Sequence, residues 1–145
     1  MGPGIVVEAK WDAVDGERSL LYSLRRMQVA PADVLFRAMA DPTRLRIMNL
    51  LRRGELCVGD LVTVLDVPQP TASRHLSYLR RAQLVSVRKR GLWCFYAVAP
   101  AATPLQGHLL AAVAICARSM PVLAADAARL RAAKKSGGCC PPPKA

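Results

Sequence analysis

The sequence predicts a mainly α-helical domain that carries one two-stranded β-hairpin. Apolar residues recur at helical spacing through most of the chain. By contrast, residues 85–98 form two β-favouring runs around Gly91-Leu92. The chain has 145 residues and 52% hydrophobic content, which suits one domain with tails. We expect a flexible N-terminal arm over residues 1–10, the domain over 11–135 and a flexible tail over 136–145 that carries cysteines.

The first part of the domain is predicted to contain three helices. A helix within residues 11–29 is indicated by Leu20, Leu21, Leu24 and Met27. Pro31 opens a short helix that ends near Ala40. A new helix is expected from Pro42 to Arg53, because Asp41 can cap it and proline suits its first turn. Gly54 is a typical residue just beyond a helix end.

The next segment has the order of a helix-turn-helix. Residues 55–57 are expected to be a short extended connector, 58–65 a short helix and 66–68 a tight turn. Pro70 then begins a longer helix, predicted over Gln69 to Leu84. Its apolar side is formed by Ala72, Leu76 and Leu79, and its outer side by Arg74, Ser77 and Arg81. In this motif the second helix lies in the DNA major groove.

The charge of the chain favours a polyanionic partner. The formal net charge is +11, and no Asp or Glu occurs between Asp66 and Asp126. The resulting positive field surrounds the candidate recognition helix and suits the phosphates of double-stranded DNA. A membrane surface is the competing polyanion. We do not expect one as the partner, because no basic amphipathic helix with a Trp/Phe-rich face is present.

Residues 85–90 and 93–98 are predicted to be strands that form a wing directly after the recognition helix. The turn follows the cations Arg88, Lys89 and Arg90, which would lie along DNA phosphates. An edge hairpin whose charges prevent aggregation would explain the cations. It would not explain why they lie directly after the recognition helix. The predicted fold is therefore a winged helix-turn-helix.

Two further helices are expected at the C-terminal end, over 104–119 and 122–135, separated at Pro121. One apolar stripe of the first comprises Leu105, Leu109, Ala112 and Cys116. A domain of this size cannot bury all of this stripe, so we expect a homodimer with helices near 11–29 and 104–135 at its interface. A two-fold protein would match two DNA half-sites.

The DNA contacts are predicted from side-chain chemistry and position. Near the start of the recognition helix, residues that we expect at bases are Gln69, Thr71, Ser73 and Arg74. Ser77 and Tyr78 complete its outer surface. Residues that we expect at phosphates are Arg80, Arg81, Arg88, Lys89 and Arg90. His75 faces the packed side, where a structural or DNA-proximal role is expected rather than metal ligation.

Three runs resemble the ArsR/SmtB family of winged-helix repressors: FRAMADPTRLRI at 36–47, ELCVGDL at 55–61 and QPTASRHLSYLRRA at 69–82. The resemblance covers about residues 34–98 and implies a dimeric repressor that leaves its operator when an inducer binds. The chain departs from the family at two positions. Gly59 replaces the second cysteine of the Cys-Val-Cys motif that is common in the arsenic branch. Gln83 replaces the glycine usual before the wing.

The five cysteines indicate a soft metalloid inducer in a protein that we expect to be cytoplasmic, since no signal peptide is recognisable. A reducing compartment should keep them as thiols. Arsenite is typically held by three thiolates, and methylarsenite and antimonite are the other candidate inducers. The adjacent pair Cys139 and Cys140 has no packing role in a Gly/Pro-rich tail. We expect Cys57 as the third ligand, with Cys116 as the alternative.

Other chemistries fit the sequence less well. Cys94 lies between wing aromatics, and Cys116 is expected to be a small buried hydrophobe. No zinc site is expected, because residues 104–119 offer only His108 and no acid. An enzyme is not expected either, since Cys-x-x-Cys and glycine-rich phosphate motifs are missing. A thiol redox or polysulfide sensor of the same fold remains the alternative.

Overall fold

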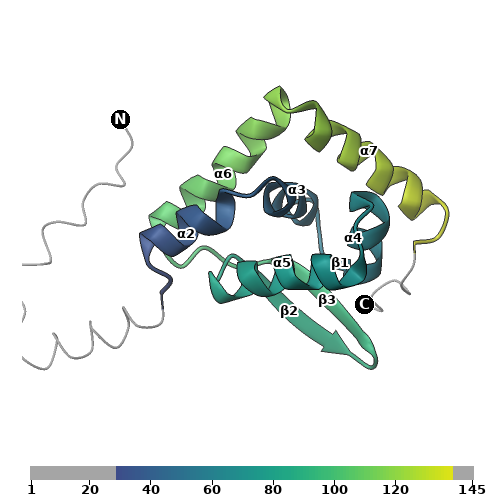
Figure 1. The fold of residues 1–145 in the computed structure, drawn as a ribbon, viewed down its shortest axis with the longest axis horizontal. Coiled ribbons are helices and arrows are strands. Elements are labelled where there is room, and N and C mark those ends of the chain that lie inside the picture. The colour runs from purple at the N-terminus through teal and green to yellow at the C-terminus, as the bar shows by residue number, and fades with distance from the viewer. Residues whose placement is uncertain (1–28, 139–145) are drawn as a thin grey trace, which may run out of the picture.

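The computed structural model describes residues 29–138. The predicted arm, almost all of the helix predicted within 11–29, and Cys139 and Cys140 lie outside this range. The described helices are α2 (Ala32–Met39), α3 (Pro42–Leu51), α4 (Val58–Leu65), α5 (Gln69–Arg81), α6 (Pro104–Ser119) and α7 (Pro121–Lys135). The strands are β1 (Leu56–Cys57), β2 (Val85–Arg90) and β3 (Trp93–Val98). Figure 1 shows α6 and α7 on one side of α3, with α5 and the β2–β3 hairpin on the other.

Helix α3 begins as the sequence predicts. The Asp41 side chain accepts a hydrogen bond from the backbone N–H of Arg44 at 2.9 Å, and Pro42 occupies the first turn. The helix ends at Leu51, however, rather than at Arg53. The chain turns there because the backbone N–H groups of Arg53 and Gly54 bond back to Leu50 and Leu51, and Gly54 has φ +146°.

Helices α4 and α5 form the predicted helix-turn-helix. Asp66, with φ 55°, ends α4 in the left-handed region. The side chains of Ala72, Leu76 and Leu79 on α5 are fully buried, as the helical spacing predicts. They anchor α5 to the core and leave its polar side outward.

Helix α5 ends at Arg81, so the prediction that it extends to Leu84 was wrong. The chain reverses its direction at Gln83, which has φ 61°. The backbone N–H of Leu84 bonds to the Leu79 carbonyl, and that of Gln83 bonds to the Arg80 carbonyl. This is the Schellman arrangement, in which glycine is the usual left-handed residue. Gln83 occupies that position, and its Oε1 accepts a hydrogen bond from Ala30 N at 3.0 Å.

The wing has one more strand than the sequence predicts. Strands β2 and β3 pair antiparallel with Arg90 opposite Trp93, and Gly91 takes φ 61° at the turn. The expected connector instead forms β1, which pairs with β3 to give the order β1-β3-β2. Its register places Cys57 opposite Phe95. The pairing was not predicted because it joins residues far apart in the sequence.

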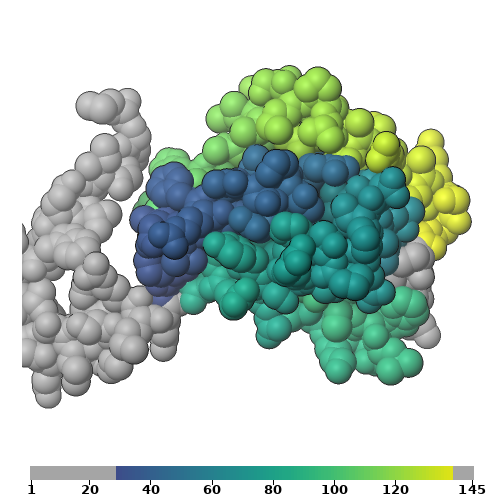
Figure 2. Space-filling model, viewed as in Figure 1, coloured from purple at the N-terminus to yellow at the C-terminus, as the bar shows by residue number. Residues whose placement is uncertain are grey.

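Helices α6 and α7 meet at a 93° bend at the predicted proline. Helix α7 packs across α3 and α4, and in the space-filling view α6 and α7 lie on the edge opposite the wing (Figure 2). The core contains buried side chains from α2 to α5, with contributions from Val113 and Leu130. No single described helix has the length and apolarity needed to cross a membrane, although the bent α6–α7 pair meets both criteria together.

Candidate nucleic-acid interface and cysteine positions

The outer side of α5 exposes most of the residues that the sequence assigns to DNA. Exposed side chains are those of Gln69, Arg74, Ser77, Arg80 and Arg81. Thr71, Ser73 and Tyr78 are half-buried. Ser77, Arg80 and Arg81 line an open recess near the end of the helix. This end therefore combines a hydroxyl with two guanidinium groups, a set that matches a DNA phosphate.

The cations of the wing differ in their surroundings. Lys89 is exposed, whereas Arg90 is half-buried. Arg88 donates to Glu55, with Nη2 2.6 Å from Oε1, and its guanidinium lies 5.6 Å from the centre of the Phe95 ring. The hydrogen bond to Glu55, more than its charge, raises the pKa of Arg88. Arg88 is still half-exposed, but its charge is partly neutralised.

The tip of the wing also exposes apolar surface. Leu92 is 98% exposed and Trp93 is 43% exposed.

Tyr96 of β3 has a raised pKa. Burial is the main cause, and the nearby Cys94 is a further cause. The Tyr96 phenol is therefore neutral at ordinary pH.

Cys57 joins two elements. It is the last residue of β1 and the N-cap residue of α4, and its side chain is 1% exposed. It is disulfide-bonded, which differs from the expectation of five thiols, whereas Cys94 and Cys116 are free. Cys139 and Cys140 lie outside the described residues. Within residues 29–138, no three His, Cys, Asp or Glu side chains are grouped as a metal site would require.

The outer side of α6 leaves apolar surface uncovered. The side chains of Gln106 and Val113 are buried. In the predicted stripe, Ala112 is exposed and Leu105, Leu109 and Cys116 are half-buried. The expectation that Cys116 is buried was therefore wrong, because the helix turns Val113 inward instead. Ile115, 63% exposed, extends the uncovered surface.

The chain is similar to known bacterial regulatory proteins. The family model described as bacterial regulatory protein, arsR family, matches residues 41–87. The arsenic resistance transcriptional regulator ArsR2 of Pseudomonas putida is 38% identical over 104 residues, which are 71% of this chain and 88% of that protein. The chain belongs to the arsR family of bacterial regulatory proteins. The resemblance seen in the sequence is thereby confirmed at the level of the family.

Further relatives and solved structures are similar to this arsR-family chain. The arsenical resistance operon repressor of Escherichia coli K12 is 52% identical over 67 residues, which are 46% of this chain and only 57% of that protein. The solved structure of reduced HlyU from Vibrio cholerae superposes with a TM-score of 0.53 at 30% identity, covering 71% and 97% of the two chains. The homodimeric winged helix-turn-helix domain Mb0332 from Mycobacterium bovis superposes with a TM-score of 0.51 at 25% sequence identity. The match covers 74% of this chain and 90% of that domain.

Family membership confirms the predicted winged helix-turn-helix and the prediction of a regulator rather than an enzyme. The match over residues 41–87 contains α3, α4 and α5. It leaves the α6–α7 region and the cysteine tail outside.

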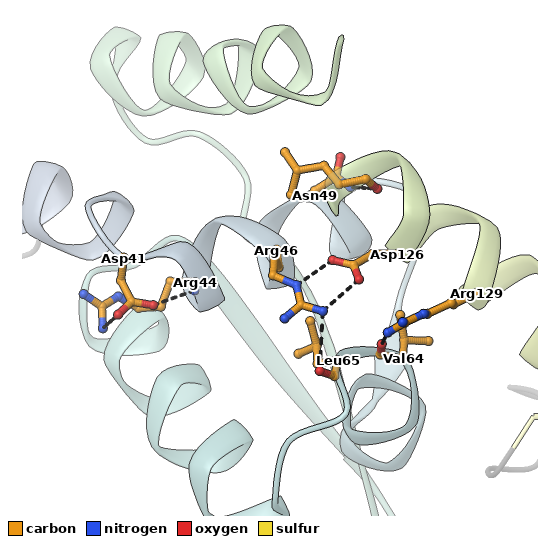
Figure 3. Close-up of polar contacts among 9 residues, drawn as sticks. Asp41, Arg44, Arg46, Asn49, Val64, Leu65, Asp126 and Arg129 are labelled. Atoms are coloured by element: carbon orange, nitrogen blue, oxygen red, sulfur yellow. Dashed lines mark hydrogen bonds and ion pairs between the residues drawn. The ribbon is translucent and has the colours of Figure 1, made fainter. Parts of the chain in front are cut away.

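A polar network that the sequence analysis missed attaches α7 to α3 and α4 (Figure 3). Arg46 on α3 binds both carboxylate oxygens of Asp126 on α7, and Arg129 donates to the Val64 carbonyl of α4 at 3.3 Å. Asn49 donates to the Leu123 carbonyl at 3.1 Å. The sequence signal was Asp126 itself, which is the first acid after a long acid-free region and the only acid in α7.

Proposed function

We propose that this arsR-family chain binds double-stranded operator DNA as a homodimer and represses transcription. The observation that carries the proposal is the combination of an exposed Gln/Arg/Ser surface on α5 with a basic wing beside it. Base contacts would come from Gln69, Thr71, Ser73 and Arg74, and phosphate contacts from the C-terminal end of α5 and the wing. A DNA target implies a cytoplasmic protein.

The dimer is supported by the uncovered apolar surface of α6 and by the homodimeric Mb0332 domain. The repressor role is supported by the name of the Escherichia coli relative. Two protomers related by a two-fold axis would place their α5 helices in successive major grooves.

We further propose that trivalent arsenic is the inducer, with antimony as a possible substitute. The proposed ligands are the sulfurs of Cys57, Cys139 and Cys140, with Cys116 as the alternative to Cys57. The Escherichia coli and Pseudomonas putida relatives described above are named for arsenical or arsenic resistance. Soft trivalent metalloids prefer thiolates to the oxygen and nitrogen ligands of harder ions.

The position of Cys57 gives this proposal a mechanism. Its backbone pairs with Phe95 of the wing, while the next residue begins α4. A ligand that displaced Cys57 would therefore move the wing and the helix-turn-helix together. If arsenic binding lowers DNA affinity by a given factor, DNA must lower arsenic affinity by the same factor.

The test is release of DNA by arsenite. Fluorescence anisotropy of labelled promoter DNA is followed during an arsenite titration under a non-thiol reductant, because Cys57 must be reduced to bind arsenic. The Cys139→Ser/Cys140→Ser and Cys57→Ser variants should keep DNA bound, whereas the Cys94→Ser control should release it like the wild type. Release from the double variant at the wild-type arsenite concentration would exclude the tail as the sensor.

One observation favours the alternative function of thiol-based redox sensing: Cys57 is disulfide-bonded in the structure. In that case hydrogen peroxide would oxidise two thiols to a disulfide and would itself be reduced to water. Peroxide should then release DNA from the wild type but not from the Cys57→Ser variant, and a reductant should restore binding. A polysulfide should act similarly: the Cys57 thiolate attacks a sulfane sulfur, an S–S bond of the polysulfide breaks, and a shorter polysulfide leaves as the persulfide forms. Insensitivity to both reagents, with release by arsenite, would exclude this alternative.

A further inference from the structure

Arg44 connects three helices near the start of α3. Its Nε donates to the Ala38 carbonyl at 2.7 Å and its Nη2 donates to the Arg37 carbonyl at 3.0 Å, so it satisfies the end of α2. Nη1 lies 3.8 Å from Asp41 Oδ2, and Figure 3 shows the two side chains together above α5. The Arg44 side chain is only 14% exposed. Most of its hydrogen-bonding capacity is therefore directed into the protein.

The flat side of the same guanidinium faces α5. Its Cζ lies 4.1 Å from the centre of the Tyr78 ring, within the range of a cation–π contact. Nη1 is also 3.4 Å from Nδ1 of His75, one turn earlier on α5. Because the hydrogen bonds to α2 fix the plane of the guanidinium, Arg44 restricts the position of the Tyr78 ring.

Tyr78 extends this arrangement to the exposed surface. The Arg81 guanidinium lies 5.9 Å from the Tyr78 ring centre. The two residues are three apart on a helix, a spacing that brings side chains into contact. Arg81 also lines the open recess with Ser77 and Arg80. Contacts thus run from Arg44 through the Tyr78 ring to a group that can bind phosphate.

We infer that Arg44 is a positioning residue for the contact between the DNA backbone and the C-terminal end of α5. It acts through Tyr78, which orients Arg81 toward a phosphate held in the recess with Ser77 and Arg80. Arg44 does not itself touch the DNA. The inference rests on the proposed DNA-binding function and adds to it a residue outside the predicted contact set.

The test uses the full chain and a mixed-sequence DNA duplex, because phosphate contacts do not require an operator. Affinity is measured over a range of salt concentrations. The Arg44→Lys variant keeps the charge but loses the planar guanidinium, and Tyr78→Leu loses the ring while Tyr78→Phe keeps it. Arg129→Lys is the matched control, because Arg129 also donates to a carbonyl but does so on α4.

Arg44→Lys and Tyr78→Leu should each weaken binding about 5-fold and reduce the salt slope by about one, the value of one lost phosphate contact. Their combination should be no weaker than either alone, and Arg129→Lys should keep the wild-type slope. Tyr78→Phe, which keeps the ring, should have a steeper salt slope than Tyr78→Leu. Losses that multiply in the double variant, or an unchanged slope for Arg44→Lys, would overturn the inference.

Two further outcomes are decisive. If circular dichroism shows that Arg44→Lys does not fold, the inference is tested by comparing the salt slopes of Tyr78→Leu and Tyr78→Phe. Equal slopes for these two variants overturn it. If the wild type shows no salt-dependent binding to the duplex, the proposed DNA-binding function fails together with it. Wild-type binding with equal slopes in all variants removes only the role of Arg44.

Discussion

Arg46 and Asp126 form a two-pronged ion pair across 80 residues of sequence. Arg46 Nε lies 2.8 Å from Asp126 Oδ2, and Nη2 lies 2.9 Å from Oδ1. The Asp126 side chain is 1% exposed and that of Arg46 is 19% exposed. The hydrogen bond to Asp126 is the main cause that raises the pKa of Arg46. The pair attaches α7 to the first helix that the family model covers.

Removing Arg46 should strongly destabilise the fold. Arg46→Ala leaves a buried carboxylate without its partner, and we expect the free energy of unfolding to fall by about 3 kcal/mol. The control is Arg37→Ala, which removes an exposed pair with Asp33 at 3.9 Å and should change stability by about 0.5 kcal/mol or less. Urea unfolding at one protein concentration measures both. Similar midpoints for the two variants would contradict the structural role of the pair.

Substitutions of Gln83 should change the stability of the protein according to how well the new residue adopts the left-handed backbone conformation. Gln83→Ala and Gln83→Gly both remove the hydrogen bond to Ala30, but only glycine adopts φ 61° without strain. We therefore expect the glycine variant to be more stable than the alanine variant by about 1 kcal/mol. Thermal unfolding of the two proteins at equal concentration tests this difference. An alanine variant as stable as the glycine variant would mean that the turn at Gln83 is not strained.

Glu55 should limit the affinity of the wing for DNA. Glu55→Gln removes the negative charge beside Arg88 and makes the guanidinium available to a phosphate. We expect tighter binding to a mixed-sequence duplex and a salt slope steeper by about one. Asp33→Asn is the matched control, because it removes an acid from α2 that pairs only weakly with Arg37. If both variants gain affinity equally, general charge and not Arg88 is the cause.

Arg74 and Lys89 should contribute differently to DNA binding, since Arg74 is exposed near the start of α5 and Lys89 is on the wing. Arg74→Ala should lower the preference for operator over mixed sequence by about 1–3 kcal/mol. Lys89→Ala should weaken binding to both duplexes about equally and reduce the salt slope by about one. Competition titrations with the two duplexes separate these effects. Identical behaviour of the variants would mean that the assigned roles are wrong.

The outer side of α6 should be part of the dimer interface. Ala112 is exposed in one protomer, so Ala112→Glu should leave the protomer folded but place a charge within the interface. We expect sedimentation equilibrium to show a dissociation constant raised by about tenfold or more. Ala125→Glu, at an exposed position of α7, is the control and should remain dimeric. Equal dissociation constants would place the interface elsewhere.

Local sequence signals predicted most of the elements. The Asp41-Pro42 start of α3, both long wing strands and the break at Pro121 were confirmed, because capping, strand alternation and proline geometry act over a few residues. The buried side of α5 was likewise correct. The end of α5 was wrong, since Gln83 takes a conformation that sequence patterns usually assign to glycine.

By itself, the sequence determined the order of the helix-turn-helix and wing and the residues on the outer side of α5. Periodicity assigns the faces of a helix, and this required no knowledge of distant partners. Only the tertiary structure decided that β1 adds Cys57 to the wing, that Arg44 lies against Tyr78, and that Asp126 pairs with Arg46. These contacts join residues far apart in the chain, and their geometry depends on how whole elements pack.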